Sequence, residues 1–175
     1  MNVKHSRNNQ LGNFTVEFAI IGVFFALLLV FSADIVVKLA YKGKLDRMSY
    51  SAVSIIKERT ELAGADNFSV GETEVDTIYD IIRRSLHRTS GSFDDKKFGF
   101  QLDIVRNGVD VVLPYHRGID CESQHPDSSL DFVTTFGRHA TLYQVTLCYD
   151  TESWFGDLIG QDFSRVSSRS ITMGR

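Results

Sequence analysis

Proline is scarce in this chain, because its 175 residues include only Pro114 and Pro126, both in the second half. The first half therefore contains no proline that would interrupt a helix. Basic residues are not in excess either. The net charge is −3, which argues against a nucleic-acid binder with a basic face. The glycine motifs of phosphate-binding loops, dinucleotide-binding folds and serine hydrolases are absent from the sequence. Composition therefore predicts early helices and gives no indication of a nucleotide-binding or hydrolytic enzyme.

Residues suited to metal or nucleophilic chemistry are few and scattered. His116, Cys121, His125 and His139 lie in one part of the chain, but their spacings match no zinc-finger or zincin pattern. Cys121 and His125 as nucleophile and base lack a recognisable oxyanion or base context. We therefore predict that the protein is not an enzyme, and that it has no catalytic residue, metal site, cofactor or small-molecule substrate.

The two cysteines of the chain are Cys121 and Cys148. An even count, in a chain whose N-terminal segment looks like an export segment, predicts one disulfide between them in an oxidising compartment. The alternative is a pair of buried, reduced thiols.

The apolar residues are concentrated near the N-terminus. Residues 1–12 are polar, carry Lys4 and Arg7 and include no acid, whereas residues 18–33 contain no charge. About 20 helical residues span about 30 Å, which is the thickness of the hydrocarbon core of a bilayer. This stretch is therefore predicted to cross a membrane, with Asp34 near the far interface.

Three interpretations of this segment compete. A secretory signal peptide has an apolar core of about 7–15 residues. The core here is longer, and Phe31 is too large to stand two positions before a cut after Ala33. A plain membrane anchor leaves Glu17 without a role, although an acid at the mouth of an apolar run is costly. In the third interpretation, a glycine, four further residues and a glutamate before an apolar helix form a prepilin-peptidase site, which cleaves between Gly12 and Asn13.

Cleavage at this position predicts a pairing role for Glu17. The new ammonium at Asn13 is free to pair with the Glu17 carboxylate of a neighbouring subunit. In a low-dielectric setting such a pair is strong, and each partner alone is costly. The pair would give a register to helices that otherwise pack on featureless apolar faces.

The basic residues around the span conflict with this orientation. The basic residues that follow the span are Lys38, Lys42, Lys44 and Arg47. Only Lys4, Arg7 and the α-amine precede it, and basic residues normally mark the cytoplasmic side. Cleavage on the cytoplasmic face nevertheless requires the leader to be inside.

The segment GNFTVEFAIIGVFFALLL resembles the TadE/TadF pseudopilins of the tight-adherence (Flp) type IVb pilus system. The shared features are the short leader, the glycine at the cut, and the core Val16, Glu17, Phe18 and Ala19 directly before the apolar run. The size of the chain, its two late cysteines and its end, SITMGR, are most similar to the TadF branch. The first mature residue, Asn13, departs from the apolar residue that type IV pilins often have there, which affects the expectation of N-methylation.

The resemblance implies a minor pseudopilin that a prepilin peptidase processes and that Flp pilus assembly requires, supporting surface adhesion and biofilm formation. Its implied partners are other pilins and pseudopilins, inner-membrane assembly proteins and the membrane itself. The implied location is the bacterial inner membrane, single-pass, with a cytoplasmic N-terminus and a periplasmic C-terminal domain. Two alternatives are a membrane-anchored periplasmic adhesive module outside the pilus, and a secreted enzyme with an ordinary signal peptide.

Periodicity predicts the rest of the fold. The first helix is expected to continue from the span to about Leu62, with apolar spacing at Leu39, Leu45, Met48, Val53, Ile55 and Ile56. A second helix is expected from about Glu72 to Arg88, with Ile78, Ile81, Ile82 and Leu86 on its apolar face. Period-two alternation predicts strands at residues 98–104, 109–113 and 142–149, the first two joined by a turn at Asn107 and Gly108.

Five further expectations complete the prediction. Residues 116–135 are expected to form an exposed loop, the tail from Val166 to Met173 an edge strand, and Trp154 part of the core. The fold class is α+β and pilin-like: a long N-terminal transmembrane helix, a second helix, then a small antiparallel sheet. The predicted organisation is leader 1–12, transmembrane helix 13–38, helix continuation 39–65 and periplasmic α+β domain 66–175.

Overall fold

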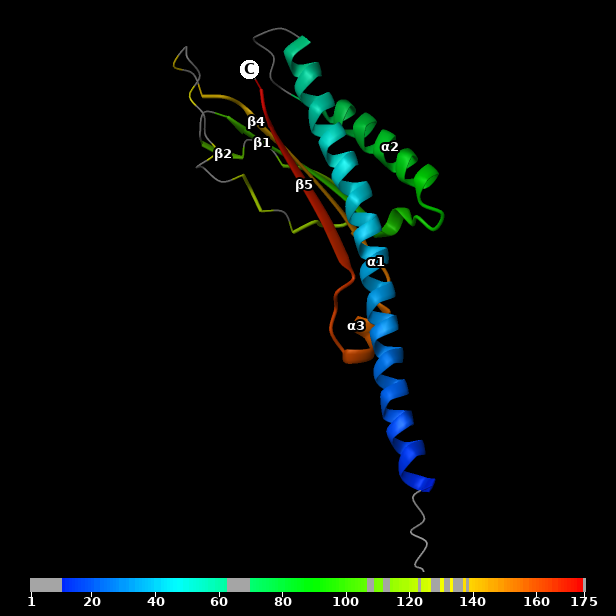
Figure 1. Cartoon of the computed structure of the whole chain (residues 1–175). Coiled ribbons are helices and arrows are strands. Elements are labelled where there is room, and N and C mark those ends of the chain that lie inside the picture. The colour runs from blue at the N-terminus through cyan, green and yellow to red at the C-terminus, as the bar shows by residue number, and fades with distance from the viewer. Residues whose placement is uncertain are drawn as a thin grey trace, which may run out of the picture.

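The computed structural model describes residues 11–62, 70–106, 109–111, 114–122, 124–126, 130, 133, 137 and 139–174, with the backbone alone for residues 11–13, 60–62 and 109–111. A helix of 52 residues, α1 (Leu11–Leu62), forms the spine of the molecule. Figure 1 shows its C-terminal part packed beside a second helix and a sheet, while its N-terminal end extends alone below the rest of the fold. We call residues 11–33 the stalk and the described residues from 34 to 174 the head.

The head contains two further α-helices, a short 3₁₀ helix and five strands among the described residues. In chain order these are α2 (Glu72–Thr89), η1 (Asp95–Lys97), β1 (Phe98–Arg106), β2 (Val109–Val111), β3 (Tyr115–Gly118), β4 (Leu142–Asp150), α3 (Trp154–Ile159) and β5 (Arg165–Met173). The predicted α+β class, with a long helix, a second helix and a small antiparallel sheet, is confirmed.

The sheet is antiparallel throughout, in the order β2-β1-β4-β5, with β3 also paired to β1. Strands β1 and β4 pair along their length, from Phe98↔Tyr149 to Val105↔Leu142. Because β4 occupies one edge of β1, β2 and β3 share its other edge. Strand β5 pairs with β4 from Asp150↔Arg165 to Leu142↔Met173, so the tail forms the edge strand that the sequence predicts.

One face of the sheet packs against α1 and α2 to form the core. The alternating residues Phe98, Phe100, Leu102 and Ile104 of β1 are buried in it, as are Tyr143, Val145, Leu147 and Tyr149 of β4. This confirms the predicted period-two pattern. The opposite face is also covered, because every residue of β4 except Asp150 is buried.

The buried faces of the two long helices include only some of the apolar residues that mark the helices in the sequence. In α1, Leu45, Ala52, Val53 and Ile56 are buried, whereas Leu39 and Ile55 face outward. In α2 the buried line is Val75, Ile78, Ile82 and Leu86, at intervals of three and four residues. Ile81, which we expected on that face, is 51% exposed. Periodicity correctly predicts both helices, but Ile55 of α1 and Ile81 of α2, which look apolar in the sequence, lie on the outer face.

A row of hydroxyl groups joins α1 to β5. Ser49 Oγ lies 3.0 Å from Ser168 Oγ and 2.8 Å from Ser170 Oγ, and Ser168 donates to Asp46 Oδ1 at 2.5 Å. Burial acts to raise the pKa of Asp46, but hydrogen bonds from Ser168 and Lys42 outweigh it and hold that pKa below its usual value. The long helix is therefore fixed to the edge strand by polar as well as apolar contacts.

Two other expectations are wrong. The expected loop at 116–135 begins with strand β3, which pairs Gly99↔Gly118 through Leu102↔Tyr115; Tyr115 is drawn into the sheet because its ring packs on the core and its hydroxyl donates to the carbonyl of Val70. Trp154 is not in the core, since 63% of it is exposed. The predicted turn at Asn107 and Gly108 lies outside the described residues.

Candidate functional site

The predicted cleavage position lies at the very start of α1. Gly12 and Asn13 follow Leu11, the first residue of the helix. The first backbone N–H groups of a helix have no partner within it, and helix ends fray. The peptide bond between Gly12 and Asn13 thus lies in the first turn of α1.

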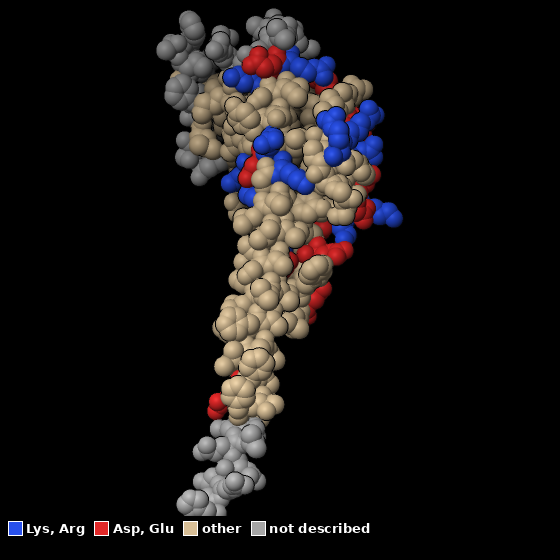
Figure 2. All heavy atoms as spheres, turned by 45° about the vertical axis from the view of Figure 1, so that its right-hand side comes forward, with Lys and Arg blue, Asp and Glu red and all other residues tan. Residues whose placement is uncertain are grey.

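The stalk presents a continuous apolar surface to its surroundings. Every residue from Phe14 to Ala33 is exposed except Val30, which is partly buried, and the large side chains Phe14, Phe18 and Leu29 are each about two-thirds exposed or more. Figure 2 shows the stalk as an almost uncharged column below a head that carries most of the charged groups. Within the described residues α1 contains the only stretch long and apolar enough to cross a membrane. Monomeric soluble proteins rarely expose so large an apolar surface.

Glu17 is the one charged residue in this column. Its side chain is exposed, and it stands four residues after Asn13, which places both on one side of the helix. Next to it on the helix, Thr15, Val16, Ala19, Ile20 and Val23 form an open apolar face.

A buried polar junction joins the stalk to the head. Asp34 is 7% exposed, and its Oδ2 accepts from Lys38 Nζ at 2.8 Å and from Ser153 Oγ at 3.2 Å. Lys38 Nζ also lies 3.0 Å from Ser153 Oγ. Ser153 is in turn the N-cap of α3, since it accepts from the N–H of Gly156. The acid at the end of the apolar run is therefore neutralised by a lysine one helical turn later.

The lysines that follow the span all hold the head together. Lys42 Nζ donates to the Ser167 carbonyl of β5 at 2.8 Å, and Lys44 Nζ donates to the Thr89 carbonyl of α2 at 2.9 Å. With Lys38, these contacts tie one helix to three separate elements of the head. Three of the four basic residues that conflict with the predicted orientation, Lys38, Lys42 and Lys44, thus have structural roles in the folded head.

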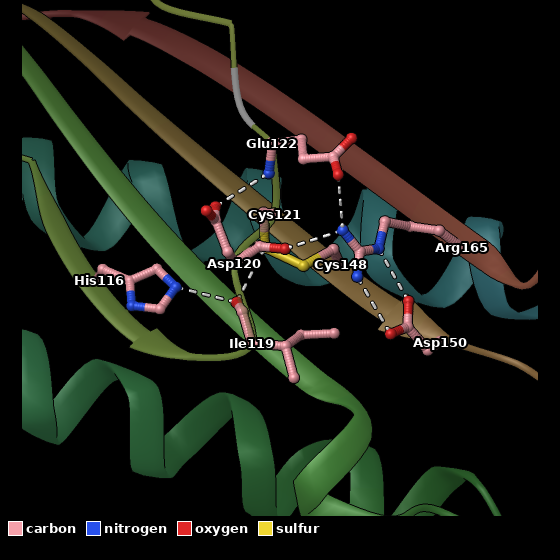
Figure 3. Close-up of a disulfide and its surroundings, with 8 residues drawn as sticks. All are labelled: His116, Ile119, Asp120, Cys121, Glu122, Cys148, Asp150 and Arg165. Atoms are coloured by element: carbon pink, nitrogen blue, oxygen red, sulfur yellow. Dashed lines mark hydrogen bonds and ion pairs between the residues drawn. A yellow bond between two sulfur atoms is a disulfide. The ribbon is translucent and has the colours of Figure 1, made fainter.

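A disulfide between Cys121 and Cys148 is present, as the sequence predicts. Figure 3 shows it holding the segment after β3 against β4. Gly99 of β1 lies directly beneath, where a Cβ atom would come within 2.2 Å of the Ile119 carbonyl and 2.6 Å of Cys148 Sγ. Glycine is required there because the bridged segment crosses the strand in contact with its backbone.

An arginine reinforces the same region. Arg165 makes two hydrogen bonds to the Asp150 carboxylate, at 2.8 and 3.1 Å, and one to the Asp120 carbonyl at 3.0 Å (Figure 3). The hydrogen bond to Asp150 raises the pKa of Arg165 above its usual value. The edge strand β5 is thereby clamped to both β4 and the bridged segment.

The residues considered for metal or nucleophilic chemistry do not form a site. Cys121 is in the disulfide and therefore has no thiolate to offer. The ring of His116 lies 3.0 Å from the Ile119 carbonyl, and the ring of His125 lies 3.7 Å from the buried Asp103. Within the described part of the chain, no group of three or more His, Cys, Asp or Glu side chains is placed to hold a metal ion.

The helix α3 is a feature that periodicity did not reveal. It packs on α1 through Phe155, whose ring lies 4.9 Å from that of Phe31 in an edge-to-face contact. A hollow of about 270 Å³ lies beside it, lined in part by Asp34, Tyr41, Lys97 and Trp154. The capping serine at 153 and the left-handed glycine at 160 are helix start and stop signals that a search for short helices would detect.

A bare apolar stalk below a compact α+β head defines a pilin-like subunit with a candidate membrane anchor. The family model described as "Putative tight adherence pilin protein F" (TadF) matches residues 5–175, which is nearly the whole chain. The chain belongs to the TadF family, and this supports its assignment as a structural component of the tight adherence pilus. No curated protein and no solved structure matches it.

Proposed function

We propose that the protein is a minor pseudopilin, cleaved by a prepilin peptidase between Gly12 and Asn13 and required for assembly of Flp pili, so that it supports surface adhesion and biofilm formation. The observation that carries this proposal is the stalk, which is apolar, exposed and free of charge except at Glu17. Such a surface suits lipid before assembly and neighbouring helices after it.

The proposed location is the inner membrane, with one span, the N-terminus in the cytoplasm and the head in the periplasm. The contacts of Lys38, Lys42 and Lys44 with the head support this orientation despite their charge. Domains are translocated largely regardless of their charge, and the positive-inside rule applies to short loops. The disulfide also fits an oxidising compartment such as the periplasm.

Cleavage requires the peptidase to reach the backbone at Gly12. A helical glycine is less stable than alanine by about 1 kcal/mol, and the first turn of a helix is the easiest to unwind. Unwinding residues 11–13 therefore costs little, and the rest of α1 is left intact. Asn13 then becomes the first residue of the mature chain.

In the assembled pilus, we place the Asn13 ammonium of one subunit against the Glu17 carboxylate of the next. The open apolar face next to Glu17 supports this arrangement, because a neighbouring helix can pack on it close to the carboxylate. The other proposed partners are further pilins and pseudopilins and the inner-membrane assembly proteins.

The N-terminal mass of the protein, isolated from cells with and without the prepilin peptidase, tests the cleavage. We expect the mature chain to begin at Asn13 only when the peptidase is present, and Gly12→Val to block the cut. Gly22→Val is the matched control, because a Cβ atom at Gly22 meets nothing within 4 Å. A chain that begins at Met1 in the presence of the peptidase would refute the proposal.

The role of the carboxylate is tested separately with Glu17→Gln. This variant should be cleaved normally but should yield few pili, because the ammonium loses its charged partner. Glu58→Gln, an exposed position on the head half of α1, is the control for a lost acid on the same helix. Normal pilus numbers with Glu17→Gln would remove the pairing role. Loss of adhesion in cells that lack the protein but keep their pili would favour the adhesive-module alternative.

A further inference from the structure

The position of α3 relative to the stalk carries a second inference. Figure 1 shows α3 at the lower end of the head, beside α1, at the level below which α1 continues alone. The contacts of Phe155 with Phe31 and of Ser153 with Asp34 fix it there. α3 therefore lies against the part of α1 where the apolar stalk ends.

The outward side of α3 is apolar and uncovered. Trp154 is 63% exposed, Leu158 is 60% exposed and Ile159 is 49% exposed. Trp154 and Leu158 are four residues apart, so they lie on the same side of the helix. We call these three residues the α3 patch. Together with the stalk they leave apolar side chains exposed on two neighbouring helices.

The length of the stalk places the α3 patch close to a membrane. From Glu17 to Asp34 the helix rises about 25 Å, and from Phe14 to Ala33 about 29 Å. The hydrocarbon core of a bilayer is about 30 Å thick. A bilayer anchored by this stalk must therefore use its whole length, which brings the lipid boundary up to Phe31 and Asp34, where α3 is attached.

We propose that the α3 patch inserts into the headgroup region of the leaflet into which the head emerges, as a second and shallow membrane contact. This rests on the proposed membrane span. Tryptophan is suited to this depth, because its ring is apolar and its N–H stays within reach of polar groups. The contact fixes the rotation and tilt of the head on the membrane, which a single helix alone leaves free.

The charges near α3 select the kind of lipid. Glu152, Asp157 and Asp162 are exposed at or beside this helix. Lys97 Nζ lies 3.8 Å from Glu152 Oε1, and Asp34 and Lys38 neutralise each other at the base of the helix. The three acids exceed the one lysine that pairs with Glu152, so the surface beside α3 keeps a net negative charge, which repels anionic headgroups. The patch therefore fits a zwitterionic surface, such as phosphatidylethanolamine or phosphatidylcholine, better than an anionic one.

Trp154 is the only tryptophan of the chain, so the intact protein reports its own depth. The full chain is reconstituted into phosphatidylcholine vesicles that carry bromine atoms either high or low on the acyl chains. We expect a blue-shifted emission that shallow bromines quench more strongly than deep ones. Adding phosphatidylglycerol should weaken that quenching.

A double variant distinguishes the α3 contact from the proposed membrane span. In Trp154→Phe/Phe24→Trp the tryptophan lies in the middle of the stalk, where deep bromines should quench it most. If that protein is quenched but Trp154 in the wild type is open to aqueous iodide and untouched by bromolipids, the α3 contact is refuted and the span stands. If neither is quenched, the span and the α3 contact both fail.

Matched substitutions test the patch itself. Leu158→Glu should reduce the quenching of Trp154 by shallow bromines and shift its emission to the red. Ile81→Glu, at an apolar position on α2 that is 51% exposed, should change neither signal. Equal behaviour of the two variants, or stronger quenching of Trp154 by deep bromines, would overturn the proposal.

Discussion

Breaking the disulfide between Cys121 and Cys148 should destabilise the head by a calculable amount. The two cysteines are 27 residues apart in sequence. Releasing a loop of that length returns conformational entropy to the unfolded chain worth about 3.5 kcal/mol at 25 °C. For a head of this size, that loss corresponds to a fall in melting temperature on the order of 10–15 °C.

The measurement is thermal unfolding of the full chain in detergent micelles, followed by near-ultraviolet circular dichroism. Oxidised protein, reduced protein and the variant Cys121→Ala/Cys148→Ala are compared. Reduced protein isolates the cross-link, whereas the double variant also loses the packing of Cys148, which is fully buried. The double variant should therefore melt at or below the temperature of the reduced protein.

Two controls make the result decisive. Alkylation and mass measurement should find no free thiol in the oxidised protein, and reductant should leave the double variant unchanged. A difference between oxidised and reduced protein below about 1 kcal/mol would refute the entropic account, since it would mean that the cross-link restrains little of the unfolded chain.

Three further predictions concern stability. Asp34→Asn leaves Lys38 without its carboxylate in a mostly buried junction and should cost about 3 kcal/mol. Asp80→Asn, at a half-exposed position that loses only its surface ion pair with Arg83, should cost less than about 1 kcal/mol; equal melting temperatures would contradict this account. Gly99→Ala should cost at least about 2 kcal/mol because the methyl group meets the Ile119 carbonyl, while Gly91→Ala meets nothing within 4 Å and should be tolerated. The pKa of Asp46 is lowered in the folded chain, so ionised Asp46 stabilises the head above the usual carboxyl pKa, and this stabilisation is lost as pH falls through the lowered pKa. Asp46→Asn should therefore flatten this part of a curve of head stability against pH, and an unchanged curve would contradict this role of Asp46.

Several features of the head depended on its three-dimensional packing. Periodicity identifies α2 as a helix, but it does not distinguish Val75 from Ile81 as a member of the buried face. Which of them is buried depends on where α1 and the sheet pack against α2. Trp154 illustrates the same limit, because a large aromatic residue is usually buried and only the end position of α3 leaves it exposed.

The sequence by itself determined the stalk, the α+β class and the candidate processing segment from Gly12 to Glu17, because apolar length, periodicity and motif spacing are local properties of the chain. Only the tertiary structure revealed the junction of Asp34, Lys38 and Ser153, whose lysine and serine are 115 residues apart. Folding also places α3 at the lower end of the head and brings Lys38, Lys42 and Lys44 into hydrogen bonds with distant segments. Contacts of this kind arise only when distant segments meet, and no periodicity in the chain records them.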